Sequence, residues 1–440
     1  MLDWPLLLAI FFGGLVFMMM IGMPVAFGFL LINIIAVSLL WGVNGFDQLI
    51  SSVFDSVAHF TFLPVPMFIL MGELMFRSGT AIAMIETVDK WLGRMPGRLS
   101  VIAVASGTLL ATLTGASMAS VAMLGKVLVP QMEAKGYDRS MILGPILGSG
   151  GLAIMIPPSS LAVIVGAIGD ISIGKILIAI IMPGLLMAAI MASYIILRAW
   201  LQPRLAPQGN VSKYPLQVKL RDSVYYILPI GIVVFLVIGV MMLGIATPTE
   251  AAVTGVIGTL ILAAIYRKLN FNLLKVSLEG TLEITVMIFM MVVTASVFTQ
   301  ILAFSGATLG LTKMATQLTI APILIIIAMQ VVVLILGCFM EVVGILMITL
   351  PIFMPIIDAF HLDPVWFAVM ILINTQIAGI SPPFGMNLFV IKGVVPQASI
   401  GEIYRAGGVY SGLSILAMAI ILVAPPVAMW LPGLMRPVGS

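Results

Sequence analysis

The sequence has few charged residues, two histidines and one cysteine. Only 8% of its 440 residues are Asp, Glu, Lys or Arg, whereas about a quarter are charged in a soluble domain. The single cysteine, Cys338, excludes an internal disulfide and a metal cluster built on cysteines. His59 and His361 do not form a zinc-binding HExxH pattern, and no phosphate-binding GxxxxGK(S/T) loop is present. These absences exclude an ATP-driven motor and disfavour an intramembrane enzyme.

Hydrophobic residues make up 62% of the sequence, which has a mean hydropathy of +1.24. This composition predicts an all-α polytopic membrane protein rather than a soluble domain with an anchor. The net charge of +3 is small, and the basic residues stand mainly in expected loops, which argues against nucleic-acid binding. The first residues lack the basic region and cleavage site of a signal peptide, so we expect the first apolar segment to be retained as a span.

Spans of about 20 apolar residues recur along the chain. We expect ten of them, near residues 5–21, 24–41, 60–77, 139–169, 174–200, 224–243, 248–266, 281–304, 364–391 and 409–431.

Two further apolar stretches, about 99–134 and 320–357, are interrupted in the middle. The first interruption falls at residues 114–117 and the second between Gly337 and Gly344. We interpret each stretch as a re-entrant hairpin. The alternative, two full crossings in each stretch, would need more residues than are present.

Two shorter stretches, 80–95 and 307–318, are amphipathic, and each follows a Ser-Gly pair and precedes an expected hairpin. We expect helices that lie in the membrane interface, with plain loops as the alternative. The segment 203–222 is rich in proline and is expected to be a flexible linker.

The chain nearly repeats itself at an offset of 225 residues, and both copies break a hydrophobic helix at a Pro-Pro pair. The matching pairs are Pro130 and Pro355, Ala134 and Ala359, Asp138 and Asp363, Ile146 and Ile371, Leu147 and Leu372, Ala153 and Ala378, Pro157 and Pro382, and Pro158 and Pro383. Non-helical backbone at membrane depth survives only where protein or a cavity covers it. Paired broken helices, here 139–169 and 364–391, are therefore the best sequence indication of a transporter's binding site.

Charge predicts the orientation of the two copies. The segments 77–98, 201–223 and 267–280 carry most of the basic residues, which places them in the cytoplasm. Asp47 and Asp55 then belong to an outer loop, and the N-terminus is periplasmic. We therefore predict two inverted repeats, 1–202 and 224–440, each with about five spans and one hairpin, joined by the cytoplasmic linker 203–223. The first hairpin enters from the cytoplasm and the second from the outside.

The hairpin tips and helix breaks hold the candidate site. Carbonyls freed at a break and helix C-termini suit Na⁺, while helix N-termini suit a carboxylate. The alternative is that the small residues only permit close helix packing. The candidates in the first half are Gly115, Ala116, Ser117, Ser149, Gly150, Gly151 and Ser159. Those in the second half are Gly337, Met340, Glu341, Asn374, Thr375, Gln376, Ser381 and Asn387.

Two carboxylates near apolar runs have competing interpretations. Glu341 could bind a cation, carry a proton or hold the hairpin tip by hydrogen bonds; the structural role is favoured because Ala116 stands at the matching position. For Glu250 we expect a helix cap, together with Thr249 and behind Pro248.

Five motifs together resemble one known family. They are TGASMASVAMLG (114–125), LAIMIPPSS (152–160), GIATPTEAA (244–252), GCFMEVVGILMITLPI (337–352) and NTQIAGISPPFGMNLFV (374–390). Over essentially its whole length the chain is similar to the large membrane subunit of a tripartite ATP-independent periplasmic (TRAP) transporter. The resemblance implies a bacterial inner-membrane, Na⁺-coupled importer of organic acids. It also implies a small four-helix membrane subunit, a soluble periplasmic substrate-binding protein and an elevator movement of hairpins and broken helices against a fixed scaffold.

The resemblance also implies site residues, with Na⁺ as coupling ion and no further cofactor. The first sodium site would use Gly115, Ala116, Ser117, Ser149, Gly151 and Ile156, and the second Gly337, Met340, Ala378, Ser381 and Phe384. A substrate carboxylate is expected near Ser117, Ser159, Asn374, Thr375 and Asn387.

The chain departs from the family pattern at four positions. Ala116 replaces a common Ser, Ala153 and Ala378 a common Gly, and Ser381 a common Thr, although ligation by backbone carbonyls survives such changes. The Ser-Asn-Thr signature of single-component divalent-anion/Na⁺ symporters is absent, which counts against a self-sufficient carrier. H⁺ coupling through Glu341 stays an alternative, and a passive channel is disfavoured because the breaks are paired.

Overall fold

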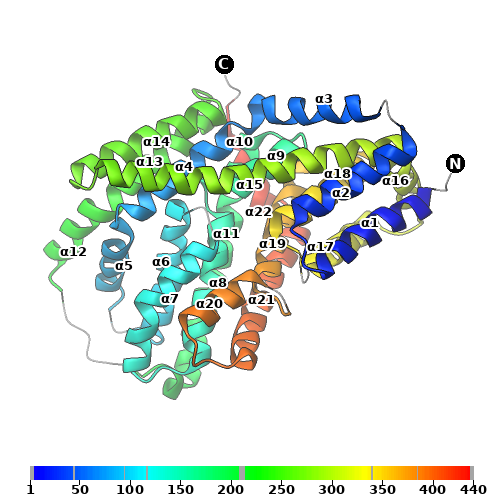
Figure 1. Ribbon diagram of the computed structural model, residues 1–440. Helices are drawn as coiled ribbons and strands as arrows, with labels where there is room; N and C mark the ends of the chain where they lie inside the picture. The colour runs from blue at the N-terminus through cyan, green and yellow to red at the C-terminus, as the bar shows by residue number, and fades with distance from the viewer. Residues whose placement is uncertain are drawn as a thin grey trace.

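The computed structural model describes residues 4–42, 45–93, 95–114, 117–207, 214–337, 340–383 and 385–436. Every regular element formed by these residues is a helix, as expected (Figure 1). The first half contains α1 (Trp4–Met20), α2 (Val25–Leu40), α3 (Gly45–Ala58), η1 (Phe60–Phe62), α4 (Pro64–Arg77), α5 (Thr80–Trp91), α6 (Arg98–Thr114), α7 (Ser117–Ala134), α8 (Arg139–Met155), α9 (Ser160–Ile168), α10 (Ile173–Ala179), α11 (Ile181–Leu201) and η2 (Pro203–Leu205).

The second half contains α12 (Leu216–Asp222), the π-helical turn η3 (Ser223–Ile227), α13 (Leu228–Met242), α14 (Pro248–Ile265), α15 (Phe271–Phe304), α16 (Ala307–Gln317), α17 (Pro322–Gly337), α18 (Val342–Ala359), α19 (Pro364–Ile380), α20 (Met386–Val394), α21 (Ile400–Val423), α22 (Pro426–Met429) and η4 (Pro432–Leu434).

Seven helical segments of the described residues are long and apolar enough to cross a membrane. The pair α8 and α9, bent by 48°, makes an eighth candidate. Helices α1 and α2 form where spans 5–21 and 24–41 were predicted, but they have 17 and 16 residues. At 1.5 Å per residue these helices are about 25 Å long, shorter than a hydrocarbon core of about 30 Å. They are apolar helices without the length of a full straight crossing.

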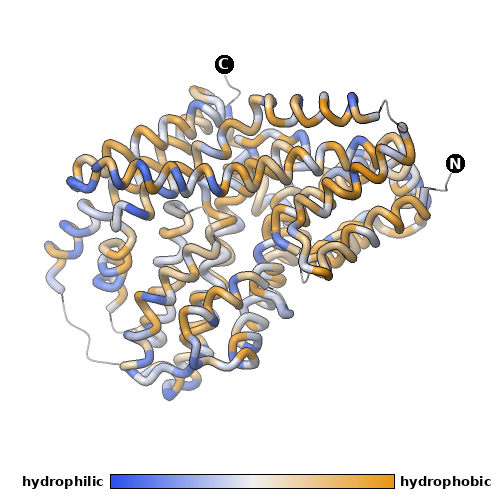
Figure 2. Tube along the Cα trace, in the orientation of Figure 1, coloured by the Kyte–Doolittle hydropathy of each residue, from blue (hydrophilic) through white to orange (hydrophobic). Residues whose placement is uncertain are grey.

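The segment 267–280 was predicted to be a loop, but helix α15 occupies it from Phe271 onwards. It starts at Phe271, where the Asn270 side chain accepts a hydrogen bond from the Leu273 amide at 2.8 Å. With 34 residues it is about 50 Å long, so it exceeds the hydrocarbon core. Figure 2 shows hydrophilic residues alternating with hydrophobic ones in its first turns, and Lys275 and Glu279 approach within 3.9 Å there. The predicted span began only at residue 281 because these turns lack a continuous apolar run.

Three other segments predicted to be loop or linker are helical. Residues 216–222 form α12, which continues through the π-helical turn into α13, so this part of the linker is not flexible coil. Lys90 of α5 donates a hydrogen bond to Asp222 at 2.5 Å and holds α12 against α5. Helix α3 occupies the predicted outer loop with Asp47 and Asp55, and α21 begins at Ile400 rather than at 409.

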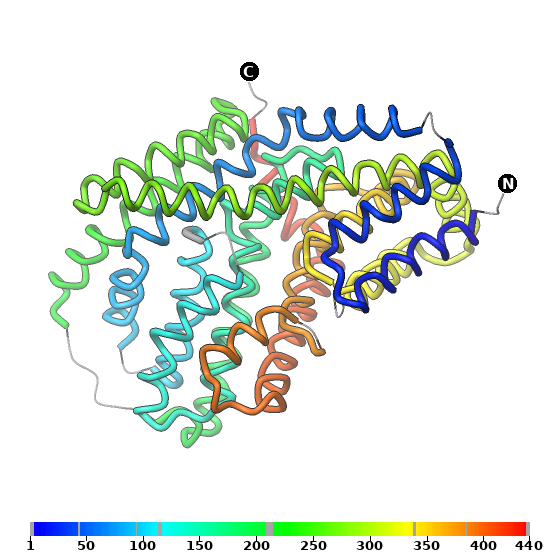
Figure 3. Tube along the Cα trace, viewed as in Figure 1, coloured from blue at the N-terminus to red at the C-terminus, as the bar shows by residue number. Residues whose placement is uncertain are grey.

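The long helix α15 runs across the molecule and contacts α2, α3, α4, α16 and α18 (Figures 1 and 3). Helices α8 and α19 lie in the interior, and every residue from Met141 to Met155 is buried. α8 contacts α6, α7, α11, α19 and α21. The two broken helices therefore form the centre on which the candidate site is built.

Several local features recur in the two halves. Asp138 caps α8 through the Ser140 amide at 2.9 Å, and its equivalent Asp363 caps α19 through the Val365 amide at 2.8 Å. Left-handed Gly79 and Gly306 precede α5 and α16, which confirms the helical part of the prediction for 80–95 and 307–318. The expected hairpin arms are the contacting pairs α6 with α7 and α17 with α18. The repeat boundaries and their opposite orientation stay predictions.

Candidate functional site

The two helix breaks fall at the predicted Pro-Pro pairs. Helix α8 ends at Met155 and α9 starts at Ser160, while α19 ends at Ile380 and α20 starts at Met386. The Pro157–Pro158 and Pro382–Pro383 peptide bonds are both cis. The hydroxyl of Ser159 accepts a hydrogen bond from the Ala162 amide at 3.3 Å and so caps α9. Ser159, a predicted substrate residue, therefore also holds the first break.

Helices α8 and α19 cross at Gly151 and Gln376. A Cβ atom built on Gly151 would lie 2.2 Å from Cγ of Gln376, so only glycine fits at this crossing. The Gln376 amide also donates to the carbonyl of Gly148 at 3.5 Å. Gly151 and Gln376 are equivalent at the 225-residue offset, so the two repeats meet at matching positions.

The first hairpin tip is tied to the second broken helix. Ser117, the first residue of α7, accepts a hydrogen bond from the side-chain amide of Asn387 in α20 at 2.6 Å. The carbonyl oxygen of Ser117 lies 3.3 Å from where a Cβ atom on Gly150 would stand. The structure thus brings together Ser117 and Asn387, both predicted substrate residues, beside the end of α8.

The other described residues of the first predicted sodium site have local partners. The hydroxyl of Ser149 donates to the Ile146 carbonyl at 3.2 Å, and its Cβ packs on Gly107 of α6. Ile156 packs against Gly184 of α11. Gly115 and Ala116 lie outside the described residues. Only Ser117 of this set is seen to contact the opposite repeat through its side chain.

The second predicted sodium site is assembled in part. A Cβ atom on Gly337 would lie 2.2 Å from Cβ of Ala378, so the end of α17 rests on α19. The hydroxyl of Ser381 donates to the Ile377 carbonyl at 2.7 Å and lies 3.3 Å from the Ser411 hydroxyl of α21. Ser381 therefore faces α21, and Phe384 lies outside the described residues.

Of the two remaining substrate candidates, Asn374 contacts the second hairpin and Thr375 bonds within its own helix. The side-chain amide of Asn374 donates to the carbonyl and to the side-chain oxygen of Gln330 at 2.6 and 2.8 Å. Thr375 donates to the Leu372 carbonyl at 2.8 Å. Gln330 was not among the predicted site residues, although it is a lone amide within the apolar run PILIIIAMQVVVLILG. Asn374 and Gln330 tie α19 to α17.

Three buried amide oxygens in this centre accept no hydrogen bond from the described residues. They belong to Asn374, Gln376 and Asn387. A buried acceptor without a donor is costly and needs an explanation such as an ion or a water. Uncharged oxygens of this kind are chemically suited to a small alkali cation or to a hydrogen-bond donor of a substrate.

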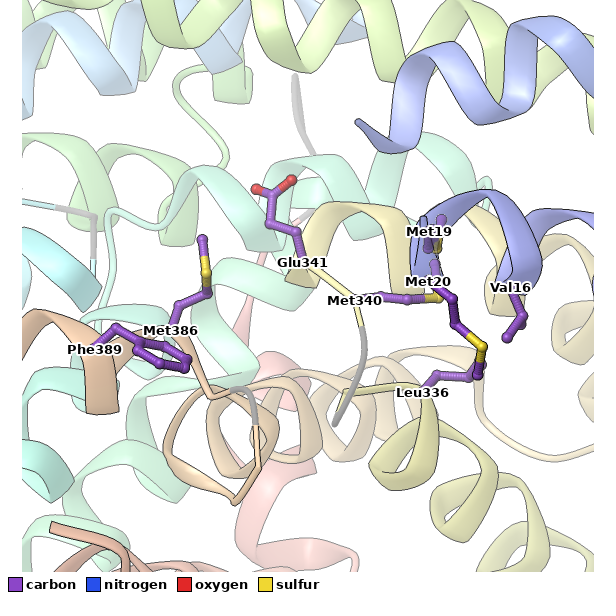
Figure 4. A pocket seen from close by; sticks show the side chains of 8 residues that line it. All are labelled: Val16, Met19, Met20, Leu336, Met340, Glu341, Met386 and Phe389. Carbon is purple, nitrogen blue, oxygen red and sulfur yellow. The ribbon is translucent and has the colours of Figure 1, made fainter. Parts of the chain in front are cut away.

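Glu341 and Met340 lie at the second hairpin tip and line a cavity of about 440 Å³. The other lining residues are Val16, Met19, Met20, Leu336, Met386 and Phe389 (Figure 4). In Figure 4 the side chains of Glu341 and Met340 leave the tip in different directions. The Glu341 carboxylate makes no hydrogen bond with a described residue and does not cap α18. The favoured structural role of Glu341 therefore has no contact to support it in the described part of the chain.

Sequence comparison places these features in a known family. Residues 12–427 match the model described as tripartite ATP-independent periplasmic transporter, DctM component. The C4-dicarboxylate TRAP transporter large permease protein DctM of Pseudomonas aeruginosa is 30% identical over 397 residues, covering 90% of this chain and 91% of that protein. The 2,3-diketo-L-gulonate TRAP transporter large permease protein YiaN of Escherichia coli is 30% identical over 388 residues, covering 88% and 89%.

Structural comparison finds a similar fold in the YdaH transporter of Alcanivorax borkumensis. The TM-score is 0.64 at 15% sequence identity, over 90% of this chain and 91% of that chain. At this identity the likeness concerns the fold alone. The family match, in contrast, spans nearly the whole chain, and the apolar helices agree with it. The chain is a multi-pass membrane protein that belongs to the DctM family of TRAP transporter large membrane subunits.

Proposed function

We propose that this chain imports an organic acid across the bacterial inner membrane by coupling its movement to Na⁺. The family match supports transport, and two relatives are named for carboxylate substrates, C4-dicarboxylates and 2,3-diketo-L-gulonate. The observation that carries the proposal is the set of orphaned amide oxygens of Asn374, Gln376 and Asn387 in the buried centre.

In this proposal Na⁺ is held mainly by backbone carbonyls at the helix ends. The first site lies between Ser117 and the end of α8, and the second between Gly337 and Ala378, where α17 and α19 pack closely. The Ser149 and Ser381 hydroxyls already have partners, so their contribution is to fix the broken helices. Na⁺ drives uptake only if it binds the substrate-competent state more tightly than the empty one.

The substrate carboxylate is proposed to bind between the tips, beside Ser117 and Asn387. Asn387 joins the second broken helix to the first hairpin, so an anion bound there contacts both halves. Asn387 is buried, so its polar contacts are strong, because the local dielectric constant is low.

An elevator movement is proposed for the hairpins and broken helices. Contacts between Gly151 and Gln376 and between Ser117 and Asn387 connect them across the two repeats. These contacts favour a single moving body. The helices packed around α15 would form the scaffold against which it moves.

Two partners complete the proposed transporter: a small four-helix membrane subunit and a periplasmic substrate-binding protein. The family to which the chain belongs is tripartite by description. The proposed topology has the N-terminus in the periplasm, as the basic segments predict.

A second candidate is H⁺ coupling through Glu341. Its carboxylate lines a cavity in which four of the eight lining side chains are methionines, and it makes no hydrogen bond with a described residue. A carboxylate in such surroundings is a candidate proton carrier.

The experiment is uptake in proteoliposomes that hold this chain, with each partner supplied or omitted in turn, against a panel of organic acids. Uptake of one acid that needs both partners supports the proposal and identifies the substrate. Uptake by this chain alone would contradict the tripartite assignment.

A further inference from the structure

A second polar cavity, of about 320 Å³, lies outside the candidate transport site. Its lining residues come from the start of α8, the end of α11 and the start of α21: Asp138, Arg139, Ser140, Arg198, Glu402, Arg405, Ala406, Val409 and Tyr410. Arg198 lies three residues before the end of α11, on the side that the charge pattern predicts to be cytoplasmic. The volume is at the lower end of the range for small-molecule sites.

Tyr410 lines this cavity. The residue is 1% exposed, and its ring packs on two glycines of α8. A Cβ atom on Gly148 would lie 2.9 Å from Cγ of the ring, and one on Gly144 would lie 3.5 Å from Cζ. The ring therefore runs along α8 with the hydroxyl at the Gly144 end, nearer to Arg139. That hydroxyl has no hydrogen-bond partner among the described residues.

Two arginines of the cavity also have unused donors. Nη1 of Arg139 is buried and makes no hydrogen bond with the described residues, although it forms a long ion pair with Glu133 at 3.6 Å. Arg405 is exposed, and no hydrogen bond or ion pair joins it to the described residues. The third arginine, Arg198, donates to the hydroxyls of Tyr194 and Ser140 at 2.8 and 3.0 Å, which fixes its guanidinium at the cavity wall.

The two carboxylates that line the cavity are engaged as helix caps. Asp138 accepts from the amide and hydroxyl of Ser140 at 2.9 and 2.5 Å. Glu402 accepts from the amide and hydroxyl of Ser399 at 2.7 and 2.9 Å. The free groups that remain are hydrogen-bond donors, and most of them are positively charged. An oxyanion is the ligand that satisfies such a set.

We propose that this cavity is an oxyanion-binding site, in which Arg139, Arg405 and the Tyr410 hydroxyl hold a phosphate group. The phosphate is either free in the cytoplasm or carried by the headgroup of an anionic phospholipid, because the cavity is lined by α8, α11 and α21 on the side that the charge pattern predicts to be cytoplasmic. A bound phosphate bridges α8, a broken helix of the centre, to α11 and α21, and stabilises their contact.

The test uses the purified full-length chain and thermal unfolding with increasing inorganic phosphate, against sodium chloride at equal ionic strength. A second arm compares nanodiscs of phosphatidylglycerol with nanodiscs of phosphatidylcholine. The variants are Arg405→Gln and Tyr410→Phe, which keeps the ring on Gly144 and Gly148. Arg204→Gln, an exposed arginine of η2, is the matched control.

Stabilisation by phosphate or by phosphatidylglycerol is expected, with an apparent affinity about tenfold weaker in Arg405→Gln and Tyr410→Phe and unchanged in Arg204→Gln. The responding probe identifies the source of the phosphate group. The proposal is overturned if neither probe stabilises the protein, or if all three variants respond alike. It is also overturned if Tyr410→Phe unfolds at a much lower temperature without anion, because the hydroxyl then has a partner within the fold.

Discussion

Gln376 lies directly on Gly151, and the two residues are 225 positions apart, the same offset that separates the two Pro-Pro pairs. When a two-fold axis relates two halves, a residue that touches its own equivalent lies on that axis. The inverted repeat stays a prediction, and in it this contact would lie at the centre about which the two halves are arranged.

Replacing Gly151 by alanine is expected to lower stability by about 1–3 kcal/mol and to reduce uptake, because the new methyl group would stand 2.2 Å from Cγ of Gln376. Thermal unfolding of the purified protein measures the effect. Adding Gln376→Ala removes the clash, so the double variant is expected to be more stable than the sum of its single changes predicts.

The control for this prediction is Gly412→Ala in α21, where a Cβ atom would meet nothing within 4 Å. It is expected to be neutral or to stabilise by up to about 1 kcal/mol, because alanine favours a helix more than glycine does. Equal loss of stability in both alanine variants would contradict the explanation by close packing.

The hydrogen bond between Ser117 and Asn387 predicts coupling between the first hairpin and α20. Ser117→Ala leaves a buried amide unpaired, which costs about 1–3 kcal/mol. We expect Ser117→Ala and Asn387→Ala each to impair uptake, and the double variant to be little worse than either single one. A double-variant cycle on uptake rates measures this, and strictly additive losses would show that the pair does not act as a unit.

The hydrogen bonds between Asn374 and Gln330 give a further prediction, because removing one partner should cost more stability than removing both. Gln330→Leu removes the side-chain acceptor of the Asn374 amide, leaves it only the Gln330 backbone carbonyl and is expected to destabilise the protein. Gln330→Leu with Asn374→Leu removes both polar side chains and is expected to recover stability. Melting temperatures of the wild type and of the two variants test this prediction. A double variant that unfolds below the single variant would mean that the amides serve a different purpose.

The broken helices and the turns could be predicted from the sequence, because proline, glycine and the length of an apolar run are local signals. The breaks at Pro157 and Pro382 and the turns at Gly79 and Gly306 are where the sequence placed them. The cap at Glu250 was also predicted. Its partner is Thr247, at 2.8 Å, rather than Thr249.

Side-chain partners could not be predicted, because they depend on which helices meet. Ser149, Thr375 and Ser381 appear as free ligands in a sequence, but in the fold each hydroxyl donates to a carbonyl of its own helix. The long start of α15 was missed for a different reason. Its first turns mix polar and apolar residues and precede the continuous apolar stretch.

The variant Glu341→Gln distinguishes coupling to Na⁺ from coupling to H⁺. If Na⁺ is held by backbone carbonyls, the neutral variant keeps Na⁺-driven uptake to within about tenfold of the wild type. If Glu341 carries the proton, uptake and its pH dependence are lost together. Uptake rates of wild type and variant across a pH series measure the difference. Glu279→Gln, a surface carboxylate of α15 paired only with Lys275, is the matched control.

The ion pair between Lys90 and Asp222 predicts a pH-dependent tether between α5 and α12. The hydrogen bond to Asp222 raises the pKa of Lys90 above its ordinary value of 10.5. Because the folded pKa is the higher one, the stabilisation is complete below pH 10.5 and is lost as the pH rises through the raised value.

Lys90→Gln is therefore expected to lower the free energy of unfolding by about 1 kcal/mol or less. The cost should be constant from neutral pH to 10.5 and vanish at higher pH. Melting temperatures across this range, with the exposed Lys175→Gln as control, test the prediction. A cost that already changes near neutral pH would assign the effect to another group.

Na⁺ coupling is the central claim, and the most direct measurement is substrate uptake into proteoliposomes with this chain and both partners, under an imposed inward Na⁺ gradient or an imposed inward H⁺ gradient. We expect the substrate to accumulate inside the proteoliposomes with the Na⁺ gradient and not with the H⁺ gradient alone. Accumulation driven by H⁺ in the absence of Na⁺ would contradict the claim.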